Sequence, residues 1–150
     1  MEAVIFIGIQ ATGKSTFYQT HFFKTHLRIN LDMLKTRHRE QILFKACLEA
    51  KQALVVDNTN PTITERKRYL ELAKKAGFKV IGYYFQSELE SAIKRNEARQ
   101  GKEKIPLVGL KNTHARLQLP SLIEGFDLLY YVRLDTKGQF VIEEWQEDEI

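Results

Sequence analysis

The sequence has little of what marks secreted, fibrous or membrane-spanning proteins. It contains one cysteine, Cys47, among 150 residues. No intramolecular disulfide framework can therefore form, and a reducing compartment, the cytoplasm, is the expected location. No apolar run approaches the roughly 20 residues that a membrane-spanning helix requires, and the first strand that we expect begins at once. We therefore expect neither a signal peptide nor a membrane contact.

Other classes of protein are disfavoured by the composition. The four histidines lack the spacing of a zinc site. Prolines and glycines number three and eight, while 28% of the residues are charged and 43% are hydrophobic, as is typical of a globular protein. We expect one domain over residues 1–150. The net charge of +4 suits a polyanionic partner.

Short apolar runs alternate with amphipathic stretches, which predicts an α/β fold with a mostly parallel sheet and helices on both faces. The expected strands cover residues 3–7, 27–29, 53–56, 78–85, 128–134 and 139–142, and the expected helices 15–26, 33–51, 62–76, 87–99 and 107–117. Capping-box spacing at Thr62–Glu65 and Ser87–Glu90 marks two of the helix starts. Ligands of such sheets lie beyond the carboxyl ends of the strands, so a site is expected there.

The segment that follows the first strand is a complete phosphate-binding loop. Its sequence, Gly8-Ile9-Gln10-Ala11-Thr12-Gly13-Lys14-Ser15, matches G-x-x-x-x-G-K-S. A preceding strand and a following helix let the backbone N–H groups converge on an anion. Lys14 would reach the β- and γ-phosphates, Ser15 would ligate Mg²⁺, and Thr16 would lie beside the nucleotide. The alternative is a glycine turn that matches by chance. The loop predicts a P-loop NTPase fold and a bound nucleoside triphosphate.

Two carboxylates follow strand ends near this loop. Asp57 ends the third apolar run, where phosphate-loop enzymes place a carboxylate that holds Mg²⁺; alternatively it begins the turn that runs to Asn60. Thr59 and Asn60 are candidates for substrate contact or for turn and cap positions. Asp32 follows the second strand, where it could accept the proton of an attacking hydroxyl. By itself, the position of Asp32 is more typical of a carboxylate in the first turn of a helix.

Basic side chains flank these positions. Lys35 and Arg37 could hold an anionic substrate or form a solvated face. Arg95 and Arg99 share one face of an expected helix, and the polar stretch that follows makes residues 95–110 a candidate helical lid with phosphate-binding cations. Exposed, solvated arginines are the alternative. For residues 66–68 the solvated face is slightly favoured, with Arg68 kept as a candidate for substrate binding.

The order of these blocks resembles that of the polynucleotide kinase family, in particular the 5′-hydroxyl kinase domain of polynucleotide kinase-phosphatases. The blocks are the phosphate loop, Asn30-Leu31-Asp32, Asp57-Asn58-Thr59-Asn60-Pro61, Arg95-Asn96-x-x-Arg99, and Pro120 to Asp127. The resemblance implies ATP as donor, Mg²⁺ as the expected metal and transfer of the γ-phosphoryl group to a 5′-hydroxyl of DNA or RNA. It implies that Asp32 is the general base, that Lys14 is catalytic and that Arg99 is the lid arginine. Many members have an arginine where this chain has Lys35.

Three functional hypotheses therefore stand. The first is a kinase of polynucleotide 5′-hydroxyls, with a single-stranded or end-exposed nucleic acid as partner. The second is a P-loop kinase of a small metabolite or nucleoside. The third is a non-enzymatic, ATP-dependent switch or binding module. Access of Asp32 to the γ-phosphate position distinguishes the third from the other two.

Overall fold

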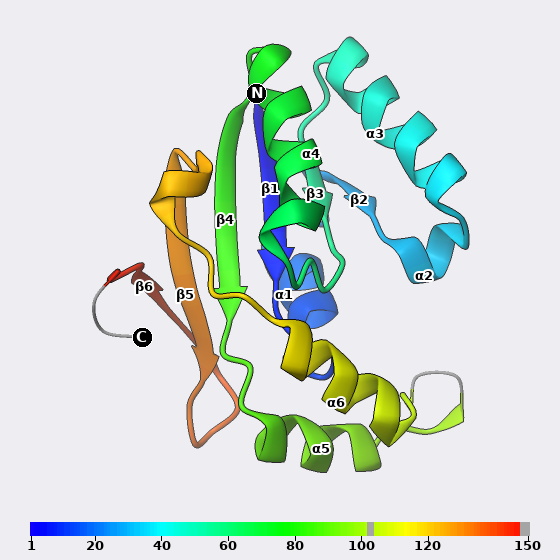
Figure 1. Cartoon of the computed structure of the whole chain (residues 1–150), viewed down its shortest axis with the longest axis vertical. Coiled ribbons are helices and arrows are strands. Elements are labelled where there is room, and N and C mark those ends of the chain that lie inside the picture. The colour runs from blue at the N-terminus through cyan, green and yellow to red at the C-terminus, as the bar shows by residue number, and fades with distance from the viewer. Residues whose placement is uncertain (102–103, 148–150) are drawn as a thin grey trace.

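The computed structural model describes residues 1–101 and 104–147. In this part of the chain six strands form one sheet in the order β2-β3-β1-β4-β5-β6 (Figure 1). The strands are β1 (Glu2–Ile7), β2 (Leu27–Ile29), β3 (Leu54–Val56), β4 (Lys79–Phe85), β5 (Leu128–Leu134) and β6 (Phe140–Glu144). The first five are parallel, and β6 pairs antiparallel with β5. The predicted α/β class is confirmed.

In the described residues, helices follow most of the strands in sequence, and in space they pack on both faces of the sheet. They are α1 (Lys14–His21), α2 (Leu31–Leu34), α3 (Arg37–Ala50), α4 (Ile63–Lys75), α5 (Leu89–Glu97) and α6 (Leu107–Arg116), with a short 3₁₀ helix η2 (Leu122–Glu124). None of the helices in these ranges is long and apolar enough to cross a membrane.

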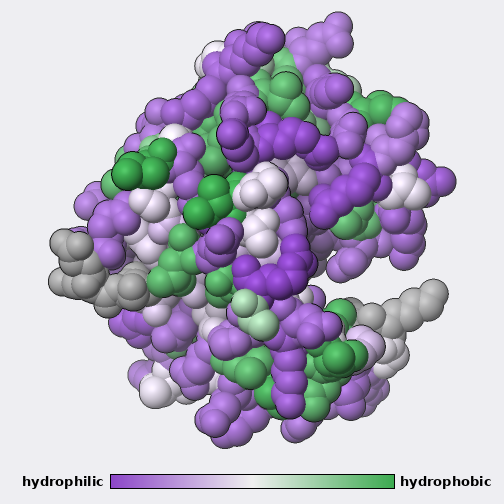
Figure 2. All heavy atoms as spheres, viewed as in Figure 1, coloured by the Kyte–Doolittle hydropathy of each residue, from purple (hydrophilic) through white to green (hydrophobic). Residues whose placement is uncertain are grey.

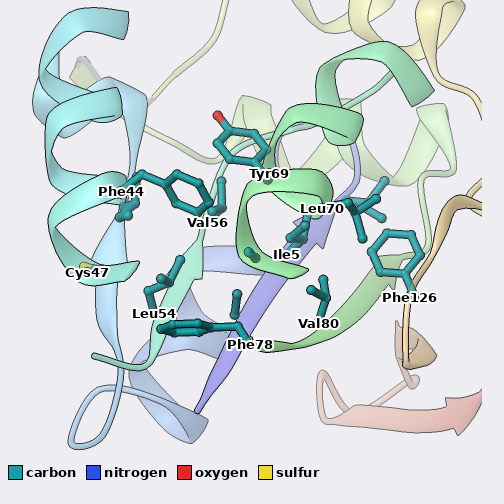
Figure 3. Packing of buried hydrophobic residues seen from close by; sticks show 14 of the residues in the cluster. Ile5, Phe44, Cys47, Leu54, Val56, Tyr69, Leu70, Phe78, Val80 and Phe126 are labelled. Carbon is teal, nitrogen blue, oxygen red and sulfur yellow. The ribbon is translucent and has the colours of Figure 1, made fainter. Parts of the chain in front are cut away.

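The core has two layers because β1 is buried on both faces. Ala3, Ile5 and Ile7 pack with side chains of α3 and α4, and Figure 3 shows Phe44 of α3 and Tyr69 of α4 on this side. Val4 and Phe6 point the other way and pack against α1. A continuous apolar run is what a central parallel strand needs. This double packing fixes where β1 ends and hence where the phosphate loop begins.

The predicted helix over residues 33–51 is wrong at its start. The chain forms the single turn α2, then Lys35 adopts a φ of 76°, a left-handed conformation that non-glycine residues rarely adopt. Thr36 restarts the helix, and its Oγ1 accepts a hydrogen bond from the Arg39 amide at 3.1 Å. Two helix starts therefore replace one, and α2 is a separate turn that directly follows the carboxyl end of β2.

Two other helix boundaries also differ from the prediction. The first helix ends at His21 rather than near residue 26. Ser87 does not cap α5, because its hydroxyl donates to the Phe85 carbonyl and accepts from the Ile9 amide. The start at Thr62 is as predicted, since its hydroxyl accepts from the Glu65 amide at 3.2 Å. The candidate lid includes residues 102–103, which lie outside the described part, so the lid stays a prediction.

Candidate active site

The phosphate loop is hydrogen-bonded to two other segments and packs against a third. The amide of Gly8 donates to the Thr59 carbonyl at 3.0 Å, and the amide of Ile9 donates to Ser87 Oγ at 3.0 Å. Gly13 begins α1 with a φ of 94°, and a Cβ there would lie 2.9 Å from the ring of Phe140 on β6. Both the backbone conformation and the close approach of Phe140 require glycine at this position.

Lys14 is buried and folds back over its own loop. Its Nζ donates to the carbonyls of Gly8 and Ile9 at 2.9 and 2.5 Å. Burial lowers the pKa of Lys14 to about 8, although the negative charges of Asp57 and Asp32 raise it and the positive charge of Arg99 lowers it further. The residues proposed for metal, base and lid roles therefore all act electrostatically on the same ammonium group.

A cleft of about 260 Å³ opens beside the loop. Figure 2 shows the surface hollowed here, between the part that carries α2 and α3 and the part formed by α5 and α6. The predicted site residues that line it are Gln10, Ala11, Gly13, Lys14, Ser15, Thr16, Asp32, Arg37, Asp57, Thr59, Asn60 and Arg99. The structure thus brings together residues from four separate stretches of the sequence. Lys35, Arg68 and Arg95 are not among the residues that line it.

Asp57 and Ser15 form a pair of oxygen ligands at one side of the cleft. Asp57 is 2% exposed, and the Ser15 hydroxyl lies 3.3 Å from Asp57 Oδ2. A hydroxyl and a carboxylate are hard oxygen donors that suit Mg²⁺, which normally takes few protein ligands and keeps several waters. No cluster of three or more His, Cys, Asp or Glu suited to a metal occurs within residues 1–101 and 104–147, so a metal here would depend on few protein ligands.

Sequence reasoning missed Arg28, which contacts both of these oxygen ligands. Its Nε donates to Asp57 Oδ2 at 2.8 Å and its Nη2 to Ser15 Oγ at 2.9 Å. Arg28 lies in the three-residue strand β2, where it is paired with Val55 of the buried strand β3. The signal in the sequence was an arginine between two apolar residues of a short expected strand. Such a position is buried or half-buried, and a charge there requires a partner.

Asp32 is exposed on the single turn α2, which is tied to the end of β3. Asn30 caps this turn by accepting from the Met33 amide at 2.9 Å, and its own amide donates to the Asp57 carbonyl at 2.6 Å. On the other side, the Leu31 amide donates to Asn58 Oδ1 at 2.8 Å. The candidate base is thus placed by two asparagines and not by local helix propensity.

The basic residues separate into different environments. Arg37 and Arg68 both contact Glu40, a fully buried carboxylate that the sequence reasoning missed. Lys35 is exposed at the end of α2. Arg95 donates from Nε to the Ala11 carbonyl at 2.5 Å, and burial lowers its pKa.

The expectation of a solvated face at residues 66–68 is wrong for Arg66. Its side chain is 0% exposed and pairs with Glu124 of η2 at 2.9 Å. Its Nη1 also donates to the Asn60 carbonyl at 2.9 Å, while the Asn60 amide donates to the Phe6 carbonyl at 2.8 Å. These bonds hold Asn60 at the base of the cleft, which we call the cleft floor. Asn60 therefore has a structural role in addition to lining the cleft.

Comparison with known proteins agrees with this architecture. A family model described as an AAA domain matches residues 4–120. The bifunctional polynucleotide phosphatase/kinase of Schizosaccharomyces pombe is 31% identical over 132 residues, which are 83% of this chain and 32% of that protein. The L-seryl-tRNA(Sec) kinase of Methanococcus maripaludis is 28% identical over 145 residues, covering 83% of this chain and 56% of that protein. This chain therefore spans about a third of the first relative and just over half of the second.

Solved structures show the same fold. Kti12 of Chaetomium thermophilum in complex with ADP-AlF3 has a TM-score of 0.68 and 15% identity, covering 89% of each chain. A gluconokinase from Sinorhizobium meliloti has a TM-score of 0.64 and 16% identity, covering 88% of this chain and 82% of that one. Together with the sequence relatives, these matches confirm the predicted fold class and the resemblance to polynucleotide kinases.

Proposed function

The chain belongs to the AAA domain family of P-loop kinases, and we propose that it transfers the γ-phosphoryl group of ATP to the 5′-hydroxyl of a polynucleotide. The observation that carries this proposal is the position of Asp32. Its exposed carboxylate lines the same cleft as Lys14, Ser15, Asp57 and Arg99. A binding module or switch has no need of a carboxylate opposite the phosphate loop, whereas a kinase requires a group that accepts the proton of its acceptor.

Each chemical step has a residue in this cleft. Asp32 takes the proton from the 5′-hydroxyl as its oxygen attacks the γ-phosphorus, and the bond to the bridging oxygen breaks to release ADP. Lys14 and Arg99 stabilise the negative charge that spreads over the transferring group. Ser15 and Asp57 would hold Mg²⁺, which supplies neutralisation of the phosphate charge when bound.

We call the part of the cleft near α2 and the start of α3 the acceptor side, and its shape and charge favour a large, anionic acceptor. The cleft is open, and Arg37 lies at its lining with Lys35 and Arg39 exposed nearby. Two relatives bear names that refer to a polynucleotide and to a seryl-tRNA. A hydroxyl carried by a nucleic acid is thus the common element. The second relative makes the serine hydroxyl of an aminoacylated tRNA the second candidate acceptor.

Label transfer from γ-labelled ATP tests the proposal. The acceptors are DNA and RNA oligonucleotides with a free 5′-hydroxyl, the same oligonucleotides carrying a 5′-phosphate, a seryl-tRNA and a panel of small hydroxylated metabolites. We expect label on the 5′-hydroxyl oligonucleotides and none on their 5′-phosphorylated counterparts. Label confined to seryl-tRNA or to a metabolite would overturn the polynucleotide assignment.

The role of Asp32 is tested with Asp32→Asn in the same assay. An amide cannot accept the proton, so we expect transfer to fall by about 10²- to 10⁴-fold with ATP affinity retained. ATP affinity is measured by calorimetry. Turnover close to that of the unmodified protein would remove Asp32 from the role of base.

A further inference from the structure

Glu40 is a fully buried carboxylate on α3 that contacts donors from three segments. Tyr69 Oη donates to it at 2.5 Å, Asn58 Nδ2 at 2.8 Å and Arg37 Nη1 at 3.1 Å. Arg68 completes an ion pair at 3.5 Å. A buried carboxylate is tolerated only with partners of this kind, yet the nucleotide-binding loop uses none of these groups.

The contact with Asn58 links Glu40 to the candidate base. Asn58 has an amide group whose nitrogen donates to Glu40 and whose oxygen accepts from the Leu31 amide at 2.8 Å. Leu31 is the first residue of α2 and precedes Asp32. The negative charge of Glu40 selects the orientation of the Asn58 amide that presents oxygen to Leu31, because only the nitrogen can donate to a carboxylate.

We propose that Glu40 is a positioning residue for phosphoryl transfer, which holds Asp32 at the cleft through Asn58 and the Leu31 amide. The expected effect on kcat rests on the proposed function. The expected effect on the stability of α2 does not depend on which acceptor is used. A single turn of helix is too short to be stable without such tertiary contacts. Errors of about 1 Å in the placement of a reacting group cost about 100-fold in rate, so such a tether affects turnover.

The test compares Glu40→Gln with Glu71→Gln. Glu71 is an exposed carboxylate on α4 that pairs with Lys67 at 3.7 Å, so it controls for the loss of one negative charge. For Glu40→Gln we expect kcat to fall by about 10- to 100-fold with the ATP dissociation constant unchanged. The KM of the acceptor should not rise, because Arg37, which lines the cleft, loses its counter-charge and attracts an anion more strongly. Glu71→Gln should change none of these quantities.

A double variant separates positioning from general loss of structure. In Glu40→Gln with Asn58→Asp, the hydrogen bond is reversed: the amide of residue 40 donates to the carboxylate of residue 58, which still accepts from the Leu31 amide. We expect kcat to recover to within about threefold of the original value, since net charge and connectivity are both restored. A double variant no faster than the slower single variant would overturn the inference.

Amide hydrogen exchange supplies a readout that needs no acceptor. Glu40→Gln should speed exchange in residues 31–34 and leave residues 14–21 unchanged, because only the first segment depends on the tether. Unchanged exchange in residues 31–34 would overturn the inference even if every transfer assay is positive. Faster exchange there with no label on any oligonucleotide would support the tether and overturn the polynucleotide assignment instead. If Glu40→Gln does not fold, Asn58→Ala removes the same link, and a normal kcat for that variant would overturn the inference.

Discussion

The two sides of the cleft are built in different ways. On the donor side, where we propose that ATP binds, the side chains of Lys14 and Thr12 bond within the phosphate loop itself, to partners two to six residues away in the sequence. Two backbone amides of the loop bond in addition to the distant residues Thr59 and Ser87. On the acceptor side, the bonds that place α2 and Asp32 join residues far apart. Leu31 and Asn58 are separated by 27 positions, and Tyr69 and Glu40 by 29.

This difference has a consequence for specificity. The donor side is specified by a short stretch of sequence that packs into the core, so it can be kept while the rest of the cleft changes. The acceptor side depends on polar contacts between α2, α3, α4 and the end of β3, and the end of β3 also contacts the loop through the bond from the Gly8 amide to the Thr59 carbonyl.

The largest effect should come from breaking the donor side. Lys14→Ala removes the one ammonium that the loop encloses, and we expect both ATP binding and transfer to be lost, with kcat/KM lower by about 10³-fold. Calorimetry with ATP and the label-transfer assay measure the two losses, and Lys24→Ala, at an exposed lysine, is the matched control. Asp32→Asn, on the other side of the cleft, should lose transfer but keep its ATP affinity. Retained ATP affinity in Lys14→Ala would show that the two sides are not separable in this way.

A pH titration probes the same lysine without a substitution. Because its pKa is about 8 in the folded protein, Lys14 loses its charge above that pH, and ATP affinity should weaken about tenfold per pH unit from there. Stability should change in the opposite direction. Between pH 8 and 10.5 the unfolded chain keeps a proton that the folded chain has released, so this group makes unfolding less favourable as pH rises. Calorimetric affinities that stay flat from pH 7 to 9 would contradict this prediction.

Sequence reasoning succeeded where structure is local. The pattern of residues 8–15 and the apolar run before it predicted the loop, because glycine positions and strand ends are encoded by neighbouring residues. The break between α2 and α3 was missed, since the helical pattern continues past Lys35, and the structure interrupts it with the positive φ of Lys35 and the new cap at Thr36. Asp32 is a candidate base because of its position after the second strand and because of the resemblance, and its role stays a prediction.

Buried charges were the main failure of the sequence reasoning. The sequence predicts a solvated face for Arg66 and indicates no role for Glu40 or Arg28, because charged side chains are mostly exposed. Each is buried or half-buried against a partner between 18 and 58 positions away. A single sequence does not reveal such pairs, and the cleft floor and the tether of α2 both depend on them.

A smaller effect is expected at Arg28, where the donor side meets the end of β3. The guanidinium of Arg28 occupies Asp57 Oδ2 and Ser15 Oγ, which are the proposed ligands of Mg²⁺. Arg28→Ala should therefore tighten Mg²⁺ binding in the presence of ADP by about fivefold, as expected for loss of a partly exposed competing ion pair worth about 1 kcal/mol. Titration of Mg²⁺ at constant ADP measures this, with Arg133→Ala at an exposed pair on β5 as control. Weaker Mg²⁺ binding would show that Arg28 supports the metal ligands instead of competing for them.

The smallest effect distinguishes two cations on the acceptor side. Arg37 lines the cleft and is paired with Glu40, whereas Lys35 is exposed and lies off the cleft. Arg37→Ala should raise the acceptor KM by about threefold, a modest amount because its charge is half-exposed and already balanced by Glu40. Lys35→Ala should change that KM by less than about twofold, and neither variant should affect ATP affinity. Initial rates over a range of oligonucleotide concentrations at saturating ATP measure both values. A larger effect at Lys35 than at Arg37 would mean that the acceptor enters over the end of α2, and the acceptor side would then extend beyond the cleft.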